Sequence, residues 1–210
     1  MLELGYDYSE HYKTMFPHFG MVLTHEDSDY AYIPVPRCGS TLFLKYFTDH
    51  YNWVPYNYNL LKDKKFFTIV RDPYERYISG LWAIADPDPN SDIVSRPIDL
   101  TNEKELDKLY DDPGLQNHHT MLQYLFYENI DLNNITFFNF DDKDFVKHFI
   151  HFLENHLNLD VCPLDEWHSS DTKVEIKNII EKNQTNFSKI QKWLEADYKF
   201  LSNIKYYESN

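Results

Sequence analysis

The residues from Arg37 to Thr41 carry the clearest chemistry in this 210-residue chain. Arg37-Cys-Gly-Ser-Thr41 places a guanidinium, a glycine and two hydroxyls between an apolar run at Tyr30–Pro36 and a helical pattern at Thr41–Tyr51. A loop that joins a strand to a helix N-terminus directs several N–H groups at one point, which makes an anion site. The ATP-binding loop needs a second glycine and a lysine after it, whereas here the cation comes before a lone glycine. We therefore predict a site for a phosphate-like group that differs from the usual nucleotide triphosphatase loop.

A second strand, loop and helix follow with a similar arrangement. Phe66–Val70 is an apolar, β-branched run that predicts a buried strand. Arg71 follows it directly, and Pro73 suits the first turn of a helix over Tyr74–Ala85 that carries Ser79. Ligands of open α/β sheets gather outside the carboxyl ends of the strands. We expect Arg71 and Ser79 to bind a second anionic group of the same ligand.

Both segments resemble the nucleotide-binding motifs of sulfotransferases. Pro36-Arg-Cys-Gly-Ser-Thr-Leu42 is similar to the 5′-phosphosulfate loop, and Val70-Arg-Asp-Pro-Tyr-Glu-Arg-Tyr-Ile-Ser79 is similar to the 3′-phosphate motif, in the same order. Weaker similarity continues through Ile135–Asp142 and Trp193–Leu201. The pattern is closer to the carbohydrate and membrane-type sulfotransferases than to the cytosolic phenol and steroid enzymes.

The resemblance implies that the chain binds 3′-phosphoadenosine 5′-phosphosulfate and transfers its sulfuryl group to a hydroxyl, most simply on a carbohydrate. Many members of the family have lysine where this chain has Arg37. Because arginine stays charged and does not readily donate a proton, we expect Arg37 to act as an electrostatic clamp in catalysis. The residues implied to bind the donor are Arg37, Cys38, Gly39, Ser40 and Thr41 at the 5′ end, and Arg71 and Ser79 at the 3′-phosphate.

The acceptor hydroxyl needs a general base, for which we consider several residues. His119 comes first, because His119-Thr-Met-Leu-Gln123 resembles a His-x-x-Pro-Gln element of some carbohydrate sulfotransferases, although the proline is missing. His50, at the end of the helix after the first loop, is second, and His168 is third. Asp49 is the carboxylate alternative. For His119 and His50 the competing interpretation is a structural role at a helix edge or end, and for His168 it is a place in the lining of the cofactor or acceptor site.

Two further residues have open interpretations. Arg76 either binds the nucleotide or pairs with an acidic neighbour inside the protein. Cys38 is either a thiol activated by the nearby cation or a small side chain that fits a tight loop. The chain has ten histidines but no HExxH-type or paired-cysteine pattern, so we expect no metal.

Composition bounds the class of protein. The length favours one domain over residues 1–210, and the net charge of −14 argues against nucleic acid and against a polyanionic acceptor. Two cysteines do not make a disulfide scaffold. The sequence has no run of membrane-spanning length and opens on acidic residues rather than a signal peptide, so we expect a cytoplasmic protein.

The predicted fold is α/β, with a central parallel sheet flanked by helices around the strand, loop and helix that bind the donor. Residues 86–114 are acidic and contain prolines, which indicates an excursion near the acceptor. We predict a loop at Tyr51–Leu61, helices at Glu103–Tyr110, Leu115–Tyr127 and Asp141–Leu157, a strand at Ile135–Phe140, and helical structure over Thr172–Ile204 with a break near Asn183. Two alternatives stay open: an ATP-using phosphotransferase, and a family member that binds nucleotide without turnover.

Overall fold

The computed structural model describes residues 21–57, 61, 63–85, 98–115, 117–127, 130–161 and 171–209. Within these ranges the chain forms one five-stranded sheet with helices on both faces, which confirms the α/β class. The strands are β1 (Met21–Thr24), β2 (Tyr30–Ile33), β3 (Val54–Asn57), β4 (Lys65–Val70) and β5 (Ile135–Asn139). The helices are α2 (Ser40–Tyr51), α3 (Pro73–Ala85), α4 (Glu103–Asp111), α5 (Phe145–His156), α6 (Asp171–Glu181) and α7 (Gln184–Leu201), with short 3₁₀ helices η2 (Gln123–Tyr127) and η3 (Leu132–Asn134).

The sheet is mixed, so the expectation of a parallel sheet is correct only for part of it. The strand order is β3-β1-β2-β4-β5; β2, β4 and β5 are parallel, while β1 is antiparallel to both β2 and β3. The connection from Thr24 to Tyr30 is a short turn in which Ser28 N–H donates to the His25 carbonyl at 3.1 Å. Such a turn can join only antiparallel strands, since a parallel pair needs a long crossover.

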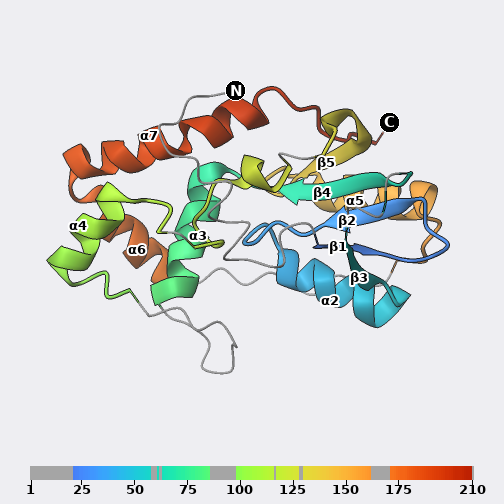
Figure 1. Ribbon diagram of the computed structural model, residues 1–210, viewed down its shortest axis with the longest axis horizontal. Coiled ribbons are helices and arrows are strands. Elements are labelled where there is room, and N and C mark those ends of the chain that lie inside the picture. The colour runs from blue at the N-terminus through green and yellow to red at the C-terminus, as the bar shows by residue number, and fades with distance from the viewer. Residues whose placement is uncertain are drawn as a thin grey trace.

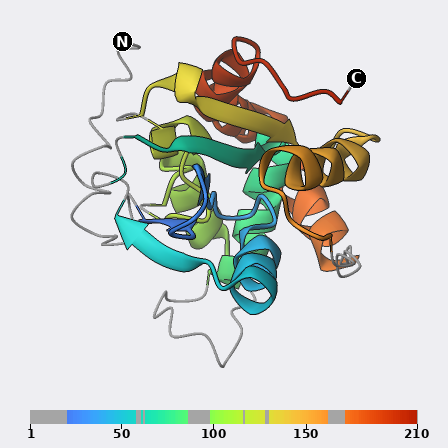
Figure 2. The ribbon, with the colours of Figure 1, turned by 90° about the vertical axis from the view of Figure 1, so that its right-hand side faces the viewer.

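The faces of the sheet are covered by different helices. Phe67 on β4 contacts Phe47 of α2 and Phe152 of α5, so these two helices cover one face (Figure 2). On the other face Phe137 of β5 contacts Tyr127 of η2 and Phe200 of α7. The sheet is therefore buried on both sides in its parallel part, which accounts for the nearly uniform apolar sequence of β4.

A second apolar cluster lies beyond the carboxyl end of β4 and is built from α3, α4, α6 and α7 (Figure 1). Tyr77 and Ile78 of α3 pack there with Leu109 of α4 and Ile180 of α6. Helix α7 runs from this cluster back over the sheet (Figure 1). The carboxyl ends of the parallel strands consequently face a layer of helices.

Several predicted elements differ from the structure. The predicted loop at Tyr51–Leu61 contains the edge strand β3, and the helix predicted from Asp141 begins only at Phe145. The helix predicted over Leu115–Tyr127 is wrong: Leu115 has a positive φ of 47°, turns follow, and only η2 is helical. Within the predicted excursion at 86–114, the short helix is confirmed as α4, and residues 86–97 lie outside the described residues.

Candidate functional site

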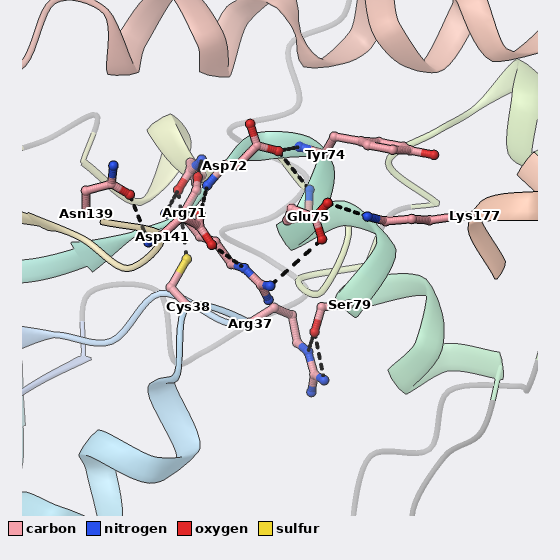
Figure 3. Close-up of polar contacts among 11 residues, drawn as sticks. Arg37, Cys38, Arg71, Asp72, Tyr74, Glu75, Ser79, Asn139, Asp141 and Lys177 are labelled. Atoms are coloured by element: carbon pink, nitrogen blue, oxygen red, sulfur yellow. Dashed lines mark hydrogen bonds and ion pairs between the residues drawn. The ribbon is translucent and has the colours of Figure 1, made fainter. Parts of the chain in front are cut away.

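The three parallel strands end side by side and bring charged residues together. The chain leaves β2 through Pro36 and Arg37, leaves β4 at Arg71, and leaves β5 just before Asp141. Carboxyl ends of parallel strands meet at one edge of the sheet, where ligands of α/β proteins bind. Figure 3 shows Arg37, Arg71 and Asp141 gathered at this edge together with Ser79 of α3. Residues that the sequence singled out from two separate motifs thus share one site.

The first loop enters α2 through two residues with left-handed backbone angles. Arg37 and Gly39 both have left-handed φ angles, 67° and 76°, on either side of Cys38. Gly39 is the N-cap of α2, and no side-chain hydrogen bond from the described residues caps this end. The first N–H groups of a helix lack partners within the helix, and the helix dipole makes that end positive. Ser40 and Thr41 open α2, so their hydroxyls and N–H groups lie at this end.

Arg37 reaches from the loop to α3. Its Nε and Nη2 both donate to Ser79 Oγ at 3.2 Å (Figure 3). Its guanidinium lies 5.4 Å from the centre of the Trp82 ring. Burial, followed by the positive charges of Arg71 and Arg76, lowers the pKa of Arg37 to about 10. The group is still a cation at neutral pH, in surroundings that would gain from an anion.

Arg71 is held in place by carboxylates. Its Nε lies 3.4 Å from Asp141 Oδ1 and its Nη2 lies 4.0 Å from Glu75 Oε2, while Phe140 packs under the guanidinium at 5.4 Å. Asp141 also accepts a hydrogen bond from Asp72 N–H at 2.6 Å. The Asp72 carboxylate in turn accepts from two N–H groups in the first turn of α3, at 2.9 Å each. Asp72 and Asp141 therefore link Arg71 to the first turn of α3, which fixes the orientation of the arginine.

Arg76 has a structural role inside the protein, although its partners are backbone carbonyls and not the acidic neighbour that the sequence suggested. It is 1% exposed, and it donates to three carbonyl oxygens rather than to an acidic neighbour. The acceptors are Pro36 at 3.0 Å, Met121 at 2.5 Å and His118 at 3.4 Å. Arg76 thereby ties the first loop to the turn that carries His118 and His119.

A buried carboxylate binds the backbone in the segment where a helix over Leu115–Tyr127 was predicted. Asp197 of α7 accepts from the N–H groups of Gln123 and Tyr124 at 2.8 and 2.9 Å and so caps η2. Burial raises the pKa of Asp197 to about 6, against the opposing effect of Arg76. Gln123 connects this capped turn to the second motif, because its Nε2 donates to the Arg71 carbonyl at 2.8 Å.

Cys38 is a packing residue in this structure. It is fully buried, and its Sγ lies 3.8 Å from Gln123 Oε1. Burial raises the pKa of the Cys38 thiol to about 12, so the thiolate is not formed at neutral pH. This favours the small-side-chain interpretation over a nucleophile, since only the thiolate attacks readily.

His119 lies against α3 beside the two motifs. A Cβ added at Gly80 would come within 2.1 Å of the His119 carbonyl oxygen, so the turn packs directly on the helix backbone next to Ser79. The rings of His118 and His119 are 3.9 Å apart. Burial, then His118, Arg37 and Arg76, lower the pKa of His119 to about 3. The imidazole is therefore neutral at pH 7 and has a lone pair to accept a proton.

Gly80→Ala tests this close packing. We expect the variant to lose up to about 2 kcal/mol of unfolding free energy, because overpacking against a rigid carbonyl costs about 1–3 kcal/mol, of which the better helix propensity of alanine offsets about 1 kcal/mol. Urea denaturation measures the change. A variant that is more stable than the wild type would contradict the contact between α3 and the His119 turn.

The other base candidates lie elsewhere. His50 is exposed in the last turn of α2, about 15 Å along the helix from Ser40 at 1.5 Å per residue, and packs on Tyr46. Asp49 is exposed at the same end of α2. His168 lies outside the described residues. Of the base candidates among the described residues, only His119 lies close to the two motifs.

Sequence reasoning missed residues that complete the surroundings of the site. Asp141 orients Arg71, Trp82 lies against Arg37, and Lys173 contacts the same Trp82 ring. The position of Trp82, three residues after Ser79 on one helix, could have placed it near the site. Lys173 had no sequence signal, because it arrives from a distant helix.

The described residues offer no evident metal site or membrane span, and comparison with known proteins identifies no relative. In the ranges that the structure describes, no group of three or more His, Cys, Asp or Glu side chains could hold a metal ion. No helix in that part of the chain is both long and apolar enough to cross a membrane. No protein-family model, no curated protein and no solved structure matches the chain. The case for a function therefore depends on the geometry and chemistry of the site.

Proposed function

We propose that this protein is a sulfotransferase that moves the sulfuryl group of 3′-phosphoadenosine 5′-phosphosulfate to a hydroxyl, on a carbohydrate acceptor. The observation that carries the proposal is the meeting of Arg37, Ser79 and Arg71 at the carboxyl ends of β2 and β4 (Figure 3). Two basic groups from two strand–loop–helix units suit a ligand with two anionic groups. The sequence motifs favour the phosphosulfate donor over other such ligands.

The loop residues supply positive electrostatic potential for the transfer. The donor, when bound, supplies a sulfuryl group and a phosphate leaving group. Arg37, the Ser40 and Thr41 hydroxyls and the N–H groups at the start of α2 would stabilise the negative charge that grows on the leaving oxygen. Fixed donors of this kind need no reorganisation during the reaction. The acceptor oxygen forms a new bond to sulfur as the bond from sulfur to the phosphate oxygen breaks.

His119 would take the acceptor proton. Its pKa of about 3 keeps it unprotonated; burial lowers that pKa most, followed by His118 and then by the cations Arg37 and Arg76. An anionic donor beside Arg37 offsets that positive charge and raises the pKa of His119 towards the range of an effective base. The basicity of the histidine is thus coupled to donor binding.

The proposed reaction is tested by incubating the protein with sulfur-labelled donor and a panel of glycans and small alcohols. Label on a glycan hydroxyl supports the proposal. Tight binding of the desulfated nucleotide with no transfer to any acceptor would instead favour a binding protein without turnover. The acidic net charge of −14 leads us to expect neutral glycans ahead of sulfated ones.

Arg71→Ala tests how the site selects its nucleotide. We expect affinity for adenosine 3′,5′-bisphosphate to fall about 10- to 100-fold, because a charge-assisted hydrogen bond contributes about 1.5–3 kcal/mol. Affinity for AMP, which lacks the 3′-phosphate, should hardly change. Calorimetric titration of both ligands measures this, and equal losses for the two would remove Arg71 from the 3′-phosphate.

A further inference from the structure

Two cationic side chains contact the ring of Trp82 on α3. The Arg37 guanidinium lies 5.4 Å from the centre of its ring, and Lys173 Nζ lies 5.3 Å from the same centre. Arg37 comes from the loop after β2, whereas Lys173 is near the start of α6, more than a hundred residues later. The indole on α3 therefore contacts both the arginine of the first motif and a lysine from a distant helix.

Lys173 lies among positive charges. Burial, then the charges of Arg71 and Arg37, lower the pKa of Lys173, and only Glu75 opposes them. Lys173 and Arg37 form no ion pair with a carboxylate among the described residues. Like charges repel when partly removed from water, so this arrangement costs free energy unless an anion joins it.

Lys177 provides the contrast. It lies one turn further along α6, where its ammonium is ion-paired with Glu75 and lies 5.8 Å from the centre of the Tyr74 ring (Figure 3). Its charge is already balanced inside the protein. Two lysines four residues apart on one helix thus have different electrostatic roles.

We propose that Lys173 is a third anion-binding residue of this site, which contacts one of the two anionic groups of the nucleotide, in addition to Arg37 at the 5′ end and Arg71 at the 3′-phosphate. This inference rests on the proposed function. The flexible lysine side chain can leave the Trp82 ring to reach a phosphate oxygen, and cation–π contacts are weak enough to be exchanged for a charge-assisted hydrogen bond. Helix α6 thereby becomes part of the binding site, which the sequence motifs alone place on β2, α2, β4 and α3.

The test compares Lys173→Gln with Lys177→Gln, which remove the same charge from the same helix. Calorimetric titration uses two probes, adenosine 3′,5′-bisphosphate and inorganic pyrophosphate. We expect Lys173→Gln to weaken binding about 10-fold or more, as for loss of a charge-assisted contact, and Lys177→Gln to change it about threefold or less. Thermal unfolding of both variants checks that each is folded.

Similar losses in both variants would show only a long-range effect of charge and would overturn the inference. Unchanged affinity in Lys173→Gln would overturn it as well. The two probes separate this failure from failure of the proposed function. If the wild type binds pyrophosphate but not the bisphosphate, the nucleotide assignment fails, while the loss in Lys173→Gln still decides whether Lys173 binds the anion. A wild type that binds neither probe would overturn both.

Discussion

Replacing Arg37 with alanine is expected to lower kcat for sulfuryl transfer about 100-fold or more, by analogy with deletion of one oxyanion donor. The guanidinium is partly buried at the start of the loop before α2, and its pKa of about 10 keeps it charged. The guanidinium would stabilise the negative charge on the leaving oxygen more strongly in the transition state than in the bound donor. Binding of the desulfated nucleotide should therefore fall less than kcat. Steady-state kinetics and calorimetry on the same variant measure the two quantities.

Two control variants separate the charge of Arg37 from its contact with Ser79. Arg37→Lys should keep part of the activity, because lysine supplies the charge without the planar fork. Ser79→Ala removes the acceptor of both Arg37 hydrogen bonds and leaves the cation in place. If Arg37 acts on the transition state, Ser79→Ala should affect nucleotide affinity more than kcat. Normal turnover in Arg37→Ala would exclude a catalytic role.

His119→Ala is expected to abolish transfer while nucleotide affinity stays near that of the wild type. The residue is neutral at pH 7, and it lies on the backbone of α3 next to Ser79. Product formation with a glycan acceptor and calorimetry with adenosine 3′,5′-bisphosphate measure the two effects. His50→Ala is the matched control, since His50 is exposed at the far end of α2. An active His119→Ala together with an inactive His50→Ala would move the role to α2, and two active variants would favour Asp49 or an acceptor that needs no base.

The same variant has a readout that does not depend on turnover. The pKa of His119 is lowered from 6.5 to about 3 on folding, so the unfolded chain binds the proton more readily. The contribution of this histidine to stability is thus complete above pH 6.5 and is lost as the pH falls towards 3. At pH 5 the loss is about 2 kcal/mol at 1.36 kcal/mol per pH unit. Urea denaturation should show a smaller loss between pH 7 and 5 in His119→Ala than in the wild type.

The core of the fold could be predicted from local sequence. The runs at Tyr30–Pro36 and Phe66–Val70 are apolar and end in polar loops, and both became strands followed by the expected helices. The strand β3 was missed because it includes a proline at the edge of the sheet, and β1 was not predicted either. The parallel sheet was therefore predicted without its antiparallel part.

Long-range contacts explain the remaining differences. The apolar spacing over Leu115–Tyr127 predicts a helix, but Asp197, more than seventy residues later, caps the N–H groups of Gln123 and Tyr124. No local pattern contains that information. In the site, the approach of Arg71 to Arg37 followed from the rule for strand ends. The contact between Arg37 and Ser79 and the arrival of Lys173 depend on how α3 and α6 pack.

Calorimetric comparison of adenosine 3′,5′-bisphosphate with ATP and magnesium tests the central claim most directly. The site has two arginines from two motifs, and the loop before α2 lacks the second glycine and the lysine of an ATP-binding loop. We expect the bisphosphate to bind without a metal and at least about 10-fold more tightly than ATP with magnesium. This ratio corresponds to the free energy of one charge-assisted contact with the 3′-phosphate. Tighter binding of ATP with magnesium than of the bisphosphate would contradict it and favour a phosphotransferase.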